Sequence, residues 1–166
     1  MLRPEFVRRK LQLIADDLAR LLRFKDETLA SLTADDLKLA AVERLLERIV
    51  MRAIDINEHL LGELATGEEA RSTRLTYRET FLGLAALSVY PTESAEQLAR
   101  SAGLCNILMH DYNDAGRKIV HQSIEACLQD YTRYIDYVDC LLQPPHPCKT
   151  RKPHGGLPRQ LSARTR

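Results

Sequence analysis

The sequence predicts an all-α fold, an antiparallel bundle of about five helices. In each long segment the apolar residues recur three and four positions apart, which is the period of a helix that buries one face. We find no segment with the apolar–polar alternation of a half-buried strand and no internal repeat. The connections between the periodic segments are short, as is typical of an up-and-down bundle.

The first two helices are predicted over residues 3–25 and from Thr33 to about residue 65. Pro4 suits the first turn of a helix, where its missing N–H costs nothing. Thr33 can cap the second helix, and Gly67 lies just beyond its expected end. The apolar surface of this second helix is wide, so we expect neighbours on more than one side.

Two shorter helices follow. Thr76 and Glu79 form a capping-box pattern ahead of a helix over residues 77–87. Pro91 then breaks the chain, and Thr92 is expected to cap a fourth helix that ends near His110.

The fifth helix is predicted to begin at Asp114, which can cap it, and to end at residue 142, before two prolines. Its apolar residues form a stripe that we expect to enter the core: Ile119, Ile124, Cys127, Leu128, Tyr131, Ile135, Val138 and Leu142.

Asp55, Asn57 and His59 interrupt the apolar surface of the second helix. Two interpretations stay open. These polar groups are either satisfied by neighbouring helices or one of them borders a functional cleft.

The chain of 166 residues is expected to form one domain over residues 1–142, followed by a basic, proline-rich tail over residues 143–166. The tail holds six basic residues and no acid, so the rest of the chain is mildly acidic although the total net charge is +1. We expect the tail to be disordered, either without a role or as an electrostatic arm for nucleic acid.

The N-terminal residues are charged and no apolar signal-peptide region follows them, which favours a cytoplasmic protein with no membrane span. The four cysteines lack CxxC spacing and suggest neither a zinc site nor a disulfide framework. Cys127 and Cys140 are expected to be buried free thiols. No cofactor motif is found, and none is expected.

Chemically capable side chains gather near the end of the fourth helix, at Cys105, Asn106, His110 and Tyr112. His110 can exchange a proton near neutral pH. Asn106 lies four residues earlier and therefore on the same helical face. A metal site at His110, Asp111 and Asp114 and a Cys105–His110 nucleophile pair are alternatives, but the first matches no usual ligand spacing and the second has no orienting group.

The stretch from Asn106 to Tyr112 resembles the Arg-Asn-x-x-x-His-x-Tyr signature of HEPN-domain toxins of the HepT type. Residues 41–61 look like the long second helix of that family, and residues 76–91 look like its middle hairpin. The resemblance covers roughly residues 5–142.

The resemblance implies a HEPN-like bundle that acts as a homodimer and as a metal-independent endoribonuclease on RNA, with tRNA as one candidate. It assigns catalysis to His110 and Asn106 together with position 105. It further implies a type VII toxin–antitoxin pair, in which a MntA-like nucleotidyltransferase antitoxin AMPylates Tyr112.

One residue departs from the signature, because Cys105 stands where the family has arginine. A neutral thiol cannot bind phosphate as a guanidinium does. Arg117 and Lys118, just past the turn, are the best-placed candidates for replacing that charge at an RNA phosphate. Arg71, Arg74 and Arg78 are an alternative that would approach across the dimer, whereas Arg100 is too far back along the helix to replace position 105 directly. The alternative is a catalytically degenerate HEPN module that still dimerises and binds a nucleotidyltransferase.

Overall fold

The computed structural model describes residues 2–64, 75–110 and 114–143, with the side chains of residues 105–110 and 114 outside this description. Every regular element in this part is helical, as the sequence predicts. The long helices are α1 (Pro4–Leu21), α3 (Asp36–Leu64), α6 (Thr92–His110) and α7 (Asp114–Leu142). The short elements are η1 (Leu22–Phe24), α2 (Leu29–Thr33) and α5 (Tyr77–Ala86). The predicted tail, apart from Gln143, lies outside the described residues.

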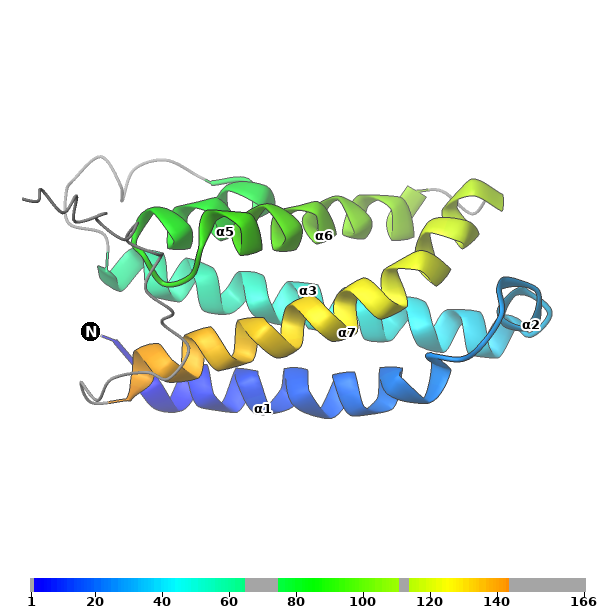
Figure 1. The fold of residues 1–166 in the computed structure, drawn as a ribbon, viewed down its shortest axis with the longest axis horizontal. Helices are drawn as coiled ribbons and strands as arrows, with labels where there is room; N and C mark the ends of the chain where they lie inside the picture. Colours follow the sequence, from blue (N-terminus) through cyan, green and yellow to red (C-terminus); the bar gives the residue numbers. More distant parts are fainter. Residues whose placement is uncertain (1, 65–74, 111–113, 144–166) are drawn as a thin grey trace, which may run out of the picture.

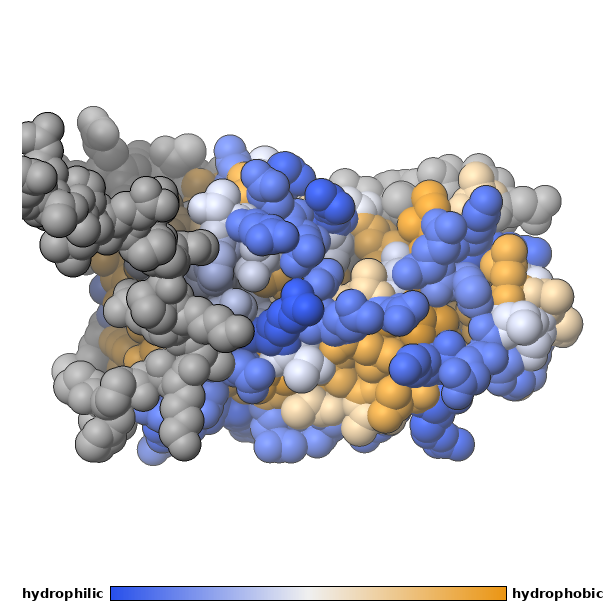
Figure 2. All heavy atoms as spheres, in the orientation of Figure 1, coloured by the Kyte–Doolittle hydropathy of each residue, from blue (hydrophilic) through white to orange (hydrophobic). Residues whose placement is uncertain are grey.

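The helices form an elongated bundle in which α7 crosses obliquely in front of α3, between α1 and the α5–α6 pair (Figure 1). Hydrophilic residues cover much of the face in Figure 2, and hydrophobic residues gather along the seam between α1 and α7. Within the described residues, no helix has both the length and the apolar character needed to cross a membrane.

The start of the second predicted helix differs from expectation. Thr33 ends the short helix α2, and its hydroxyl donates to the carbonyl of Leu29 at 2.9 Å, so it caps nothing downstream. Asp35 caps α3 instead, because its carboxylate accepts from the backbone N–H of Leu37 at 3.0 Å and of Lys38 at 3.1 Å. The second predicted helix is therefore α3, which begins three residues after Thr33, and the short helix α2 ahead of it was not predicted.

The helix α5 begins as predicted, with the side chains of Thr76 and Glu79 forming a complete capping box. It packs closely on α3, since a Cβ added to Gly83 would lie 2.9 Å from Cδ2 of Leu61. Ser88 then takes a positive φ of 60° in the turn that leads back to α6. Thr92 is the first residue of α6 rather than its cap. The backbone carbonyl of Pro91 accepts from the N–H of Ala95, so α6 begins one residue earlier than predicted.

Half of the predicted stripe on α7 is buried, including the fully buried Tyr131 and Val138, and Leu128, Ile135 and Leu142 are partly buried against the core. Ile119 is an exception, with 38% of its surface exposed. Cys127 is buried and free as expected, whereas Cys140 is disulfide-bonded, so the prediction of a free thiol is wrong there.

Candidate functional site

The predicted catalytic residues belong to the last two turns of α6. The backbone is helical through His110, so Cys105, Asn106 and His110 have the helical spacing expected of them. Their side chains lie outside the described residues, as does Tyr112 altogether. Their roles therefore stay predictions.

Two kinds of contact fix α6 in place just ahead of these positions. Ala99, Ala102 and Leu104 are buried against the core. Ser101 and Tyr131 join α6 to α7 through their hydroxyl groups, 2.6 Å apart. The segment that leads into the motif is thus held rigidly on α7.

Arg117 and Lys118 lie in the first turns of α7, directly after the motif. Arg117 is half-buried and acts electrostatically on Glu43 of α3. Burial raises the pKa of Glu43, and the charge of Arg117 opposes that rise. Lys118 is exposed and forms no salt bridge within the described part of the chain. Its charge is the more available of the two.

His121 lies one turn further along α7 and was not singled out by the sequence. Its Nε2 is 2.7 Å from the backbone carbonyl of Glu27, in the loop before α2. Glu27 in turn accepts from Lys38 at 2.8 Å, and this hydrogen bond lowers the pKa of its carboxyl. A lone histidine on a predicted helix gives no signal for this contact, which ties α7 to the start of α3.

Asp55, Asn57 and His59 are satisfied by neighbouring helices, as one of the two interpretations proposed. Asp55 forms a salt bridge with Lys10, and His59 Nε2 accepts from the backbone N–H of Arg3 at 3.1 Å. All three residues are near the end of α3, whereas His110 ends α6 at the opposite end of the bundle (Figure 1). They do not border the motif.

Two surface grooves flank α6. The α5–α6 groove has a volume of about 620 Å³ and includes Tyr77, Arg78 and Ala99 among its lining residues. The α6–α7 groove, of about 520 Å³, includes Ile119 and Asp130. Arg100 and Gly103 line both grooves, so they stand on the ridge between them.

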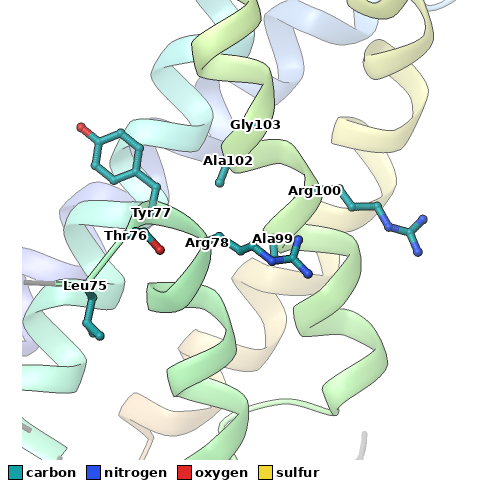
Figure 3. Close-up of a pocket in the computed structure, with 8 residues that line it drawn as sticks. All are labelled: Leu75, Thr76, Tyr77, Arg78, Ala99, Arg100, Ala102 and Gly103. Atoms are coloured by element: carbon teal, nitrogen blue, oxygen red, sulfur yellow. The ribbon is translucent and has the colours of Figure 1, made fainter.

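Figure 3 shows how the two arginines of the α5–α6 groove are placed. Arg78 leaves α5 and extends to the α6 backbone near Ala99, and Arg100 extends from α6 on the side away from Tyr77.

Among the described residues, no group of three His, Cys, Asp or Glu side chains is arranged to hold a metal ion.

The family of the chain follows from comparison with known proteins. The family model described as ribonuclease HepT-like matches residues 14–138, which include the whole motif. The chain belongs to the HepT-like ribonuclease family. This confirms the family, and with it the ribonuclease class, predicted from the sequence.

Two curated HepT relatives are similar to this chain. A tRNA nuclease HepT of Aphanizomenon flos-aquae (strain 2012/KM1/D3) is 32% identical over 139 residues, covering 84% of this chain and 91% of the relative. An mRNA nuclease HepT of Shewanella oneidensis is 28% identical over 93 residues, covering 56% of this chain and 66% of the relative.

Solved structures of toxin–antitoxin complexes share the fold. The tri-AMPylated Shewanella oneidensis HEPN toxin, solved in complex with an MNT antitoxin, matches with a TM-score of 0.67 at 22% identity, covering 81% of this chain and 97% of that one. A toxin–antitoxin complex with AMP-PNP matches with a TM-score of 0.68 at 22% identity, covering 82% and 98%. These matches confirm the HEPN-like helical bundle.

Proposed function

We propose that this chain is the ribonuclease toxin of a type VII toxin–antitoxin pair. It cleaves RNA in the cytoplasm without a metal ion, and a MntA-like nucleotidyltransferase holds it inactive. The observation that carries this proposal is the family match over residues 14–138, the range that contains Asn106, His110 and Tyr112. The names of the relatives, a tRNA nuclease and an mRNA nuclease, support RNA as the substrate class.

RNA cleavage without a metal needs a base for the 2′-hydroxyl, an acid for the leaving oxygen and positive charge beside the phosphate. His110 serves as the base or the acid, and Asn106 donates hydrogen bonds from the same helical face. Positions 105 and 110 are separated by roughly 7.5 Å along a helix and roughly 140° around it. Side chains at these positions reach a shared cleft from two walls.

The proposed site lacks the positive charge that the family signature has at position 105. Lys118 is the better local replacement, because it is exposed and unpaired within the described residues, whereas Arg117 is partly neutralised by Glu43. A Lys ammonium lacks the fork geometry of arginine, so we expect the replacement to be incomplete.

The active form is a homodimer in which the two α6 ends face each other, as the family resemblance implies. Each copy then contributes one motif to a shared cleft. Sedimentation of the protein at micromolar concentration should give a dimer, and a strict monomer would contradict the shared cleft.

Inhibition acts through Tyr112. The toxin in one of the matching structures is described as tri-AMPylated, and its partner is an MNT antitoxin. Each added nucleotide brings a negative charge and bulk, which would exclude RNA from a phosphate-binding cleft.

A second candidate is a catalytically degenerate HEPN module that dimerises and binds the nucleotidyltransferase without cleaving RNA. The observation that favours it is Cys105. One set of assays separates the two functions. Cleavage of tRNA in the presence of EDTA that is lost in His110→Ala supports the ribonuclease, and cleavage that persists in His110→Ala contradicts it.

The antitoxin step is tested with a MntA-like nucleotidyltransferase and ATP. The intact mass of the chain should increase by AMP-sized steps, and Tyr112→Phe should abolish them. An unmodified chain beside an active nucleotidyltransferase would show that this mechanism does not apply here.

A further inference from the structure

The ridge of α6 between its two grooves is built from small residues flanked by arginines. Ala99 and Ala102 are buried, and Gly103 is exposed. A Cβ added to Gly103 would meet nothing within 4 Å, so the space above this backbone is open. A ligand can therefore approach the helix backbone closely at this point.

The charge of the α5–α6 groove is positive. Its described lining residues include Arg78 and Arg100 and no acid. Arg78 is exposed and forms no salt bridge within the described part of the chain. Arg100 acts on the half-buried Asp130 across the second groove, but through charge alone. Both guanidinium groups can therefore bind an anion.

An exposed aromatic ring borders the same groove. Tyr77 is 43% exposed and lines the α5–α6 groove at the start of α5. Tyr77 and Arg78 follow each other at the start of α5, and Arg100 stands across α6. Cations together with an exposed ring are the combination that single-stranded nucleic-acid channels use, since the cations bind the backbone and the ring stacks on a base.

We propose that a single strand of RNA crosses α6 at Gly103, with its phosphates bound by Arg78 and Arg100. This proposal rests on the proposed function, because the bound strand is the substrate. Gly103 and His110 are about 10 Å apart along the helix axis. A strand held on the ridge thus passes directly to the motif.

RNA fits this ridge better than a second copy of the chain does. In a two-fold dimer a surface patch meets its own copy, so an interface centred here would bring the same arginines together. Like charges facing each other weaken an interface, whereas phosphates relieve the repulsion.

The proposal is tested with fluorescence anisotropy on a labelled oligouridine of about 12 nucleotides. We expect Arg78→Gln and Arg100→Gln each to weaken binding by about fivefold or more, since each removes a charge-assisted contact. Each should also reduce the slope of log affinity against log salt by about 0.7. Arg44→Gln is the matched control, because Arg44 is an exposed arginine on α3 that pairs with Glu47.

Gly103→Leu tests the close approach without removing charge. Its side chain would fill the open space above α6, and we expect weaker RNA binding with an undiminished melting temperature. Gly62→Leu is the control, because Gly62 is also a helical glycine with open space around it. It should leave the affinity unchanged.

The outcomes distinguish the proposed path of the RNA across α6 from the proposed ribonuclease function. If both arginine variants bind the oligouridine as tightly as the original chain while His110-dependent cleavage persists, the path is wrong and the ribonuclease stands. If the variants instead change the sedimentation of the protein and leave RNA affinity intact, the ridge is an interface between copies. If the unaltered chain neither binds nor cleaves RNA, both proposals fail.

Discussion

The carboxylate of Asp17 on α1 is fully buried and forms a salt bridge with Arg52 on α3. The same carboxylate is 2.8 Å from Arg20 and 3.1 Å from Arg48, so three guanidinium groups surround one acid. Arg52 also donates to the backbone carbonyl of Leu13 at 2.9 Å. This cluster fixes the pairing of α1 with α3.

Removing the acid from this cluster should destabilise the bundle. Asp17→Ala leaves the charge of Arg52, which is only 15% exposed, without the acid that neutralises it. We expect a loss of about 3–5 kcal/mol in the free energy of unfolding, measured by urea titration. Glu47→Ala is the control, because Glu47 pairs with a well-exposed Arg44, and it should cost no more than about 1 kcal/mol. Equal effects of the two substitutions would contradict a structural role for the cluster.

The hydroxyl of Tyr134 joins α7 to α3 inside the core. It donates to Oδ1 of the buried Asn57 at 2.8 Å, and Nδ2 of Asn57 lies 3.4 Å from the hydroxyl of Thr80. Tyr134→Phe leaves a buried amide oxygen unpaired and should cost about 1–3 kcal/mol in unfolding free energy. Tyr137→Phe removes a hydroxyl for which no hydrogen bond is found in the described residues, and it should be close to neutral. The reverse order would show that the Asn57 contact contributes little.

Two buried tyrosines, Tyr90 and Tyr134, predict a loss of stability at high pH. Burial raises the pKa of Tyr90 and of Tyr134 above the ordinary value of 10.0. The folded state keeps these phenols neutral, while the unfolded chain loses their protons near pH 10. The contribution of these neutral phenols to the free energy of unfolding is therefore fully present below about pH 10 and decreases as the pH rises further. Phenolate absorbance should show both groups ionising only with unfolding, and early ionisation in the folded protein would refute this.

Local signals in the sequence predicted the long helices. The capping box of Thr76 and Glu79 and the apolar stripe of α7 depend on neighbours within a few residues. The short helix α2 was missed because non-local packing supports it. Leu32 is fully buried, and the loop before α2 is bonded to His121, 94 residues away in the chain.

The motif was recognisable from residue types and spacing, but the surface around it was not. Arg78 and Arg100 line one groove only because α5 packs against α6 and Gly83 lets α5 approach α3. The two cations after the motif also differ in their surroundings. Lys118 is exposed, whereas Arg117 is half-buried and interacts electrostatically with Glu43 of α3. These relationships cross from one helix to another, so no local pattern encodes them.

The departure of Cys105 from the family signature gives the last prediction. A guanidinium at this position stabilises the charge that builds on phosphate, and losing one such contact costs roughly 100- to 1000-fold in rate. We therefore expect the chain with Cys105 to cleave RNA weakly, and Cys105→Arg to raise the rate of tRNA cleavage by a factor of that order.

Two further measurements complete this prediction. His110→Ala in the Cys105→Arg background should abolish the gained cleavage, and growth inhibition on expression should follow the same order. Strong His110-dependent cleavage by the original chain would mean that another cation supplies the charge, and loss of activity in Lys118→Gln but not in Arg117→Gln would identify Lys118. If Cys105→Arg restores no cleavage, the motif has lost more than one residue, and the chain acts as a binding module for the nucleotidyltransferase.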